Sequence, residues 1–170
     1  MSAMKVKIKR LHPLAEIPAY CTDFSAGMDL KVVDIDYDEY GNCVLHTGLA
    51  FEIPEGYAGF IFPRSSNAKK DLILTNSVGI IDADYRGEVT LKYKSYFRVH
   101  NPLKVLWQYF MNRKGICDLG EIMNFWGDRY EKGDKAGQIV IMPFPKIEFD
   151  EVAELSDTQR GAGGYGSTGR

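Results

Sequence analysis

The sequence has few cysteines, almost no net charge and no long apolar run. Its three cysteines, Cys21, Cys43 and Cys117, are scattered and form no C-x-x-C pair. This argues against a disulfide framework or a zinc site and favours reduced thiols in the cytoplasm. A net charge of −2 excludes a dominant, sequence-independent grip on nucleic acid. No apolar run approaches the ~18 residues of a membrane span, and residues 1–14 lack the apolar core of a signal peptide. We therefore expect a soluble cytoplasmic protein that binds neither nucleic acid nor membrane.

What the sequence does contain is short strand-like runs separated by glycine and proline. The 170 residues, 45% hydrophobic and 26% charged, suit one globular domain. Alternating or continuous apolar runs of this kind predict β-strands. They lie at residues 5–9, 31–35, 43–51, 57–62, 72–81, 88–93, 138–144 and 146–152. Many short strands at close spacing predict an all-β barrel or sandwich.

The segment 96–131 breaks this pattern. Apolar residues recur at helical spacing from residue 103 to 111, and Asp118 stands three residues before Glu121, as in a capping box. We expect a helical hairpin inserted into the β domain. Its apolar residues have two interpretations, a cover for an exposed barrel surface or a docking patch for a protein partner.

Asp82 is the first candidate for chemistry. It ends the apolar run 72–81, and a polar turn joins it to the strand 88–93, so the natural prediction is a β-hairpin. Alternation would place Asp82 beside buried neighbours, where an unpaired carboxylate is unfavourable. With Asn76 and Tyr85, this hairpin could hold a base, stack on its sugar and activate a water. The alternative is a surface hairpin with turn-forming aspartates.

Two further stretches could bind an anion. Arg64, Ser65 and Ser66 directly follow an apolar strand, and a helix or nest beginning there would offer free N–H groups. The alternative is an ordinary serine N-cap beside a solvated arginine. Gln138, which can both donate and accept hydrogen bonds, follows the residues 133–137. Taken alone, that stretch indicates only a turn.

The C-terminal residues 157–170 are rich in glycine and predict a flexible arm that cannot fold alone. Its glycines would let backbone amides approach phosphates closely. Arg160 adds a fork-shaped donor, and Tyr165 adds a ring that could stack on a base. A merely flexible terminus is the alternative.

In their order, five stretches resemble the motifs of the trimeric dUTP diphosphatases (dUTPases). They are residues 26–30, 63–66, 76–88, 133–138 and 160–169. Together they span nearly the whole chain except the insertion. The resemblance implies a β jelly-roll-like subunit that forms a homotrimer, with each active site assembled from three chains. It also implies hydrolysis of dUTP to dUMP and pyrophosphate with Mg²⁺ as cofactor.

The resemblance assigns a role to each candidate residue. It makes Asp82 the general base that activates the water attacking the α-phosphorus. The hairpin would hold uracil and leave no room for a 5-methyl group, and Tyr85 would pack against the deoxyribose and exclude a 2′-hydroxyl. Asp29 would support the site, through metal-bound water. Mg²⁺ would be held by the triphosphate and water, with no direct protein ligand. The implied substrate contacts are Arg64, Ser65, Ser66, Asn76, Gly79, Ile81, Tyr85, Gln138, Arg160, Gly163, Tyr165, Gly166 and Ser167.

Several of these contacts are implied to cross between subunits. The arm would close over a neighbouring subunit's site, with Arg160 on the γ-phosphate and Tyr165 stacked on uracil. The arm has Tyr165 where relatives commonly have Phe, and Ser66-Asn67 replaces a common Gly-Leu. The segment 88–133 is about twice the length expected from relatives.

Two other functions stay open. The dCTP deaminases resemble dUTPases in fold and in the Ile-Asp hairpin, but they place a catalytic Glu where this chain reads Thr90-Leu91-Lys92. A lysine cannot replace a carboxylate general acid/base, and deaminases lack the glycine-rich closing motif. The other alternative is a nucleotide-gated binding or signalling protein that engages its partner through the insertion.

Overall fold

The computed structural model describes residues 3–70, 72–95 and 129–164, which form β-strands and one short 3-10 helix. The expected helical hairpin at 96–131 lies almost entirely outside the described residues. The strands are β1 (Lys7–Arg10), β2 (Met28–Lys31), β3 (Asp34–Tyr37), β4 (Cys43–His46), β5 (Leu49–Glu52), β6 (Tyr57–Pro63), β7 (Leu72–Leu74), β8 (Gly79–Ile81), β9 (Thr90–Ser95) and β10 (Lys135–Pro143), and the 3-10 helix is η1 (Ser65–Lys69).

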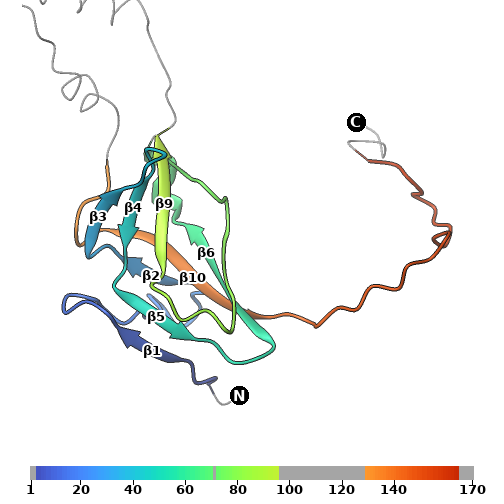
Figure 1. Cartoon of the computed structure of the whole chain (residues 1–170), viewed down its shortest axis with the longest axis horizontal. Helices are drawn as coiled ribbons and strands as arrows, with labels where there is room; N and C mark the ends of the chain where they lie inside the picture. The colour runs from blue at the N-terminus through green and yellow to red at the C-terminus, as the bar shows by residue number, and fades with distance from the viewer. Residues whose placement is uncertain (1–2, 71, 96–128, 165–170) are drawn as a thin grey trace, which may run out of the picture.

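The described strands form three antiparallel sheets. Two sheets have four strands, in the orders β2-β10-β6-β8 and β3-β4-β9-β7, and β1 pairs with β5 in a third. Figure 1 shows the sheets gathered into one β body, with β10 passing through it between β2 and β6. The nine residues of β10 pair with β6 along seven positions and with β2 near its start. The all-β expectation is therefore confirmed.

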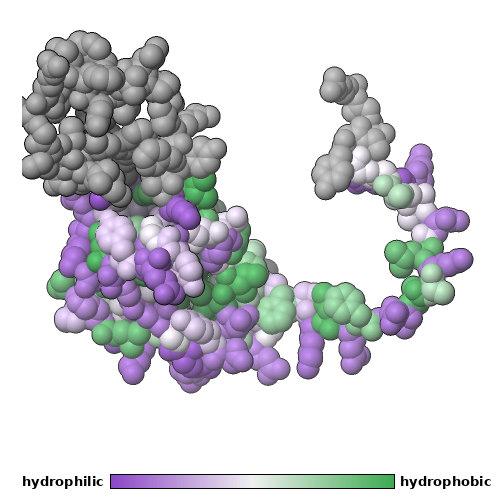
Figure 2. Space-filling model, turned by 45° about the horizontal axis from the view of Figure 1, so that its top comes forward, coloured by the Kyte–Doolittle hydropathy of each residue, from purple (hydrophilic) through white to green (hydrophobic). Residues whose placement is uncertain are grey.

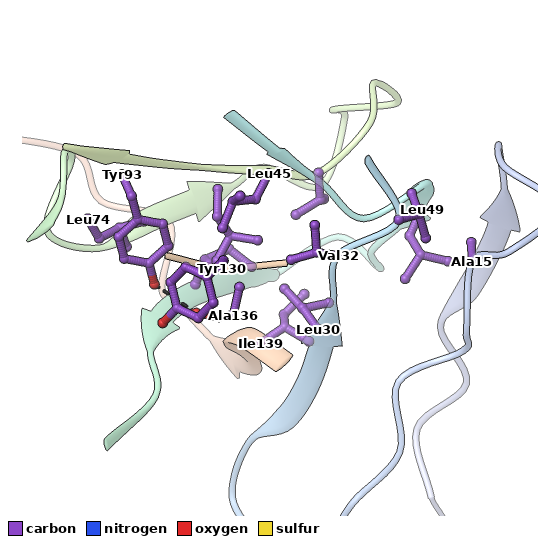
Figure 3. Close-up of a cluster of buried hydrophobic side chains, with 14 of the residues drawn as sticks. Ala15, Leu30, Val32, Leu45, Leu49, Leu74, Tyr93, Tyr130, Ala136 and Ile139 are labelled. Carbon is purple, nitrogen blue, oxygen red and sulfur yellow. Dashed lines mark hydrogen bonds between the residues drawn. The ribbon is translucent and has the colours of Figure 1, made fainter. Parts of the chain in front are cut away.

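The core lies between the sheets and takes buried side chains from seven of the ten described strands. Leu30, Leu45, Leu91 and Ile139 come from β2, β4, β9 and β10, and each is at most 1% exposed. Figure 3 shows such side chains pointing toward one another across the body. Burying a side chain of this size stabilises the fold by roughly 1.5–3 kcal/mol.

Tyr93 and Tyr130 bring polar groups into this core at its edge. The hydroxyl of Tyr93 donates to the carbonyl of Ala136 at 2.8 Å, so the buried oxygen is satisfied. Burial raises the pKa of Tyr93 far above its ordinary value. The two tyrosine rings lie 5.1 Å apart, and both hydroxyl groups are seen at the end of the cluster in Figure 3. Since Tyr130 precedes β10, this contact fixes the start of that strand.

Two predicted strands are each broken by a glycine or a change of sheet. The predicted strand 43–51 divides into β4 and β5 at Thr47 and Gly48, where Gly48 has a φ of +66°. A Cβ on Gly48 would lie 2.7 Å from Cβ of His12, so the close approach also requires glycine. The predicted strand 31–35 is likewise shared between β2 and β3.

The predicted hairpin 72–93 was wrong in its pairing. Residues 72–81 divide into β7 and β8, which belong to different sheets. β7 pairs with β9, whereas β8 pairs with β6, so β8 and β9 are not hairpin partners. The physical reason is the turn at 75–78, where Ser77 has a φ of +59° and redirects the chain from one sheet to the other.

The predicted strand 146–152 was also wrong. After β10 ends at Pro143, residues 144–152 have no strand partner among the described residues. Figure 1 shows the chain leaving the β body here and running away from it. None of the helices formed by the described residues is long and apolar enough to cross a membrane.

Candidate active site

Asp82 directly follows β8, at the point where the chain turns from one sheet toward the other. Together with Tyr85 and Glu88 it lines a hollow of about 210 Å³ whose other walls include Ile81 and Thr90. Asp82 is exposed in this chain, so the expectation of buried neighbours was wrong. The turn, in which Tyr85 N–H donates to the Asp82 carbonyl at 3.1 Å, lifts the carboxylate out of the strand alternation. Its carboxylate is therefore accessible to water and ligand.

Tyr85 is fixed by the residues that follow it. Its hydroxyl donates to the carbonyl of Glu88 at 3.0 Å, and the residue is 43% exposed. A Cβ added to Gly87 would lie 2.6 Å from Tyr85 Cζ, so the ring packs directly on the glycine. Arg86 Nη1 donates to the carbonyls of Ala83 and Tyr85, at 2.6 and 2.9 Å. These contacts hold the Tyr85 ring in one position, with part of the ring exposed.

Asn76, Gly79 and Ile81 lie beside this turn. Gly79 is opposite Ile61 of β6, and a Cβ on Gly79 would lie 3.3 Å from Nδ2 of Asn76. The amide of Asn76 therefore packs over the glycine backbone. Gly79 begins the three-residue β8, Ile81 ends it and Asp82 follows directly, so the structure brings these predicted residues together along one short strand. We call this set the hairpin group: Asn76, Gly79, Ile81, Asp82 and Tyr85.

A second set of predicted residues gathers around Asp29. Nε of Arg64 lies 2.7 Å from Oδ1 of Asp29, and Nζ of Lys135 lies 2.8 Å from Oδ2. The Asp29 side chain is only 19% exposed, so two cations shield its charge from water. Its carboxylate positions Arg64, which projects from the residue just after β6.

Gln138 joins the same set through β10. It lies opposite Asp29 in β2 and opposite Phe62 in β6, and its Nε2 donates to the Pro63 carbonyl at 3.3 Å. A Cβ on Gly27 would lie 2.7 Å from its Oε1, so the backbone at Gly27 approaches this side chain closely. We call this set the anion group: Asp29, Arg64, Ser65, Ser66 and Gln138.

The anion group borders a hollow of about 380 Å³ with a basic wall. Four cationic side chains and one carboxylate line it, together with Ser66, Tyr130 and Gly133: Lys31, Arg64, Lys70, Lys135 and Asp134. η1 begins at Ser65 directly after Arg64, whose side chain makes no capping hydrogen bond. The excess of positive charge makes this hollow suitable for an anion.

Asp82 and Arg64 lie toward opposite ends of β6, although Gly79, opposite Ile61, is only one residue along β6 from the position opposite Gln138. Ile81 is opposite Gly59, near one end of the strand, whereas Gln138 is opposite Phe62, near the other. Six residues of extended chain separate Arg64 from the position opposite Asp82, a span of roughly 20 Å. Across the described ranges, no hydrogen bond or ion pair joins the hairpin group to the anion group. Within one chain, Asp82 therefore lies well apart from Arg64.

The predicted arm contacts stay apart from both groups. Figure 1 shows the chain from residue 144 extending away from the β body, and Arg160 and Gly163 lie on this extension. There Nε of Arg160 donates to the carbonyl of Gly163 at 2.8 Å. Tyr165, Gly166 and Ser167 lie outside the described residues. Figure 2 shows hydrophobic and hydrophilic side chains alternating along this exposed segment.

A metal has no ready set of protein ligands here. The described residues contain no cluster of three His, Cys, Asp or Glu side chains that could hold an ion. Both carboxylate oxygens of Asp29 already face Arg64 and Lys135. The donor set fits a metal that arrives with a polyphosphate better than one resident in the protein.

Sequence reasoning missed three residues that support these groups. Lys135 was noted only as part of a turn, although its position three residues before Gln138 places it near the same strand end. Glu88 was taken as the start of a strand. His46, whose Nδ1 lies 2.9 Å from Glu88 Oε2, carried no signal, because the contact joins residues 42 positions apart.

Comparisons with known proteins identify the same family throughout. A family model for dUTPase matches residues 14–99. The chain is 40% identical over 171 residues to the deoxyuridine 5′-triphosphate nucleotidohydrolase of Nautilia profundicola, covering 98% of this chain and 100% of the relative. It is 37% identical over 169 residues to that of Hydrogenobaculum, covering 98% and 99%.

Solved structures show the same fold. The dUTPase of Staphylococcus bacteriophage 80alpha, determined with dUpNHpp, matches with a TM-score of 0.69 at 23% identity, covering 99% of this chain and all of that chain. A mutant dUTPase from phage phi11 of S. aureus, described with a structural Mg(II) ion, matches with a TM-score of 0.64 at 22% identity, covering 89% and 99%.

Proposed function

The chain belongs to the dUTPase family, and from that premise we propose how it hydrolyses dUTP to dUMP and pyrophosphate. The observation that carries the proposal is the placement of Asp82. Its exposed carboxylate lies at a hollow that Tyr85 also lines. A nucleoside packed against the Tyr85 ring would therefore bring its 5′-phosphates toward the Asp82 carboxylate, which can act as a general base.

In this proposal the hairpin group binds the nucleoside. Backbone groups near Asn76, Gly79 and Ile81 pair with uracil, and Tyr85 packs against the deoxyribose. Gly79 is buried against Ile61, so the backbone that would pair with uracil is closely held at this position.

Asp82 performs the chemical step as general base. Its carboxylate accepts a proton from a water molecule while the water oxygen forms a bond to the α-phosphorus. The bond between the α-phosphorus and the oxygen bridging to the β-phosphorus breaks, and pyrophosphate leaves with that electron pair. A positioned base of this kind contributes about 10²–10⁴-fold to the rate.

The anion group neutralises the triphosphate. Arg64 is held ready by Asp29, so little side-chain freedom is lost when it meets a phosphate. Ser65, Ser66 and Gln138 supply neutral hydrogen bonds beside it. Mg²⁺ would be brought by the triphosphate and would supply further charge neutralisation, with Asp29 orienting water near it.

The separation of the two groups supports a shared site in a homotrimer. A span of roughly 20 Å between Asp82 and Arg64 exceeds what one α-phosphate contact can bridge. A hairpin group from one subunit facing an anion group from another would close this gap. The exposed arm, with Arg160 and Gly163, would then reach the site of a neighbouring subunit.

The alternatives are weaker or untested. At the position where a dCTP deaminase would need a glutamate, Nζ of Lys92 instead pairs with Asp38 at 3.1 Å, which gives no acid/base group toward the hollow. A signalling function through the insertion stays a prediction, because residues 96–128 lie outside the described ranges.

The test is pyrophosphate release with Mg²⁺ from dUTP, dTTP, UTP and dCTP at matched concentrations. We expect rapid release from dUTP alone and a loss of about 10²–10⁴-fold in kcat for Asp82→Asn, with nucleotide binding retained. Ammonia from dCTP would favour deamination. Tight dUTP binding without turnover would favour a sensor.

A further inference from the structure

Glu88 is fixed by the end of the neighbouring strand β4 and the turn that follows it, since His46 lies opposite Thr90 in the β4–β9 pair. Its Oε1 accepts a hydrogen bond from the backbone N–H of Gly48 at 2.7 Å, and its Oε2 faces Nδ1 of His46 at 2.9 Å. The side chains of His46 and Glu88 are only 30% and 27% exposed. Hydrogen bonds to a carboxylate are shorter and stronger than neutral ones, and partial burial protects them from water. The Glu88 side chain therefore has one well-defined position.

The backbone next to Glu88 is tied to the same segment. The N–H of Val89 donates to the Leu49 carbonyl at 2.8 Å, and Oγ1 of Thr47 donates to the Val89 carbonyl at 2.6 Å. Thr47 and Val89 are each 1% exposed, so water does not compete for these bonds. Residues 46–49 thus anchor residues 88–89 to the core.

Tyr85 depends on this anchor. Its hydroxyl donates to the Glu88 carbonyl, and its ring packs on Gly87. No bond from the Tyr85 side chain to any other described residue is present. The position of Glu88 therefore sets the position of the ring.

We propose that His46 and Glu88 are positioning residues for Tyr85 and thereby determine how strongly the site selects 2′-deoxyribose over ribose. The inference rests on the proposed function, in which the Tyr85 ring packs against the sugar. A ring in contact with C2′ leaves no space for a further oxygen. If the ring moves by about 1 Å, part of that exclusion is lost.

The experiment measures kcat/KM of the full chain for dUTP and for UTP by pyrophosphate release. His46→Phe keeps a ring of similar size but removes the donor to Glu88. His46→Asn restores a donor near the position of Nδ1. Glu16→Gln is the matched control, because it removes another carboxylate of an ion pair, that with Lys31 at 2.6 Å, which has no contact with the Tyr85 turn among the described residues.

We expect His46→Phe to lower the dUTP/UTP ratio of kcat/KM by about tenfold, and His46→Asn to stay within about threefold of the natural protein. Glu16→Gln should leave the ratio unchanged. In a Tyr85→Phe background, which lacks the hydroxyl bond to Glu88, His46→Phe should have much less additional effect. If His46 had a merely structural role, His46→Phe would instead lower kcat/KM for both substrates to the same extent, and it would also lower the Tm.

Each contrary result has a distinct meaning. An unchanged ratio in His46→Phe, with dUTP hydrolysis intact in the natural protein, overturns this inference and leaves the proposed function standing. The inference is also overturned if His46→Phe lowers the dUTP/UTP ratio of kcat/KM as much in the Tyr85→Phe background as in the natural protein. If the natural protein does not hydrolyse dUTP, the proposed function fails and the inference with it. Should His46→Phe not fold, Glu88→Ala against Glu88→Gln tests the same link, with loss of selectivity expected only for Glu88→Ala.

Discussion

Replacing Gly87 by alanine tests how closely the position of Tyr85 controls the reaction. A Cβ on Gly87 would lie 2.6 Å from Cζ and 3.0 Å from Cε2 of the Tyr85 ring. Carbon atoms pack at about 3.5–4.0 Å, so the ring must move by roughly 1 Å. Gly87 does not have a positive φ, so alanine adds no backbone strain of its own. The full effect falls on the ring and on its 3.0 Å bond to the Glu88 carbonyl.

The expected size follows from this displacement. A misplacement of about 1 Å near a reacting group lowers turnover by up to about 10²-fold, so we expect kcat/KM for dUTP to fall by about 10–100-fold. Crowding of this kind also lowers the free energy of unfolding by about 1–3 kcal/mol. Pyrophosphate release at several dUTP concentrations gives the first quantity, and urea denaturation gives the second.

The control for Gly87→Ala is Gly41→Ala. Gly41 has a φ of +75° and no atom within 4 Å of an added Cβ, so alanine there strains the backbone without touching a neighbour. It should lower stability by about 1–2 kcal/mol and leave kcat/KM unchanged. If Gly87→Ala retains kcat/KM within twofold of the natural protein, the ring does not need the position seen here and the reasoning is refuted.

Three further predictions concern the arm, acid stability and the start of β10. Truncation after Gln159 should lower kcat/KM by tenfold or more, roughly the effect of losing a closing segment, while light scattering still reports a trimer; dissociation would contradict the proposal. The Asn42 side chain holds the pKa of Asp38 at about 2, below its ordinary 3.8, so this stabilisation is present above pH 3.8 and is lost as the pH falls toward 2. Asp38→Asn should therefore flatten the dependence of Tm on pH in that window, and an unchanged slope would count against it. Tyr130→Phe removes the 3.0 Å hydrogen bond to Asn67 Oδ1 and should lower the free energy of unfolding by about 0.5–1.5 kcal/mol in urea titrations; no loss would show that water replaces the bond.

Local sequence patterns predicted the strands well where a strand is one uninterrupted run. The run 57–62 became β6, and the run 138–144 became most of β10, because proline or glycine bounds each one. The pattern failed at residues 72–81, where apolar residues flank Asn76 and Ser77 and the chain changes sheets at the turn before Gly79. Local propensity contains no information on which sheet a strand joins.

The site shows the same limit. The ordered motifs indicated Asp82 and Arg64, but not the roughly 20 Å between them, since that separation arises from the pairing along β6. Asp29 was expected only as a supporting carboxylate, whereas its two cationic contacts depend on strands far apart in sequence. His46 could not be predicted at all, because nothing near it in the sequence marks its contact with Glu88.

The position of Asp82 and Arg64 toward opposite ends of β6 has a genetic consequence. Under the shared-site arrangement, a chain without the general base Asp82 and a chain without Arg64 are each inactive alone. The first chain still has an intact anion group, and the second still has an intact hairpin group. In a randomly mixed oligomer of Asp82→Asn and Arg64→Ala chains, about one site in four would receive both intact halves, since each half is chosen independently with even odds. Two defective alleles could then complement each other in one cell, and a single defective allele would damage sites built partly from normal subunits.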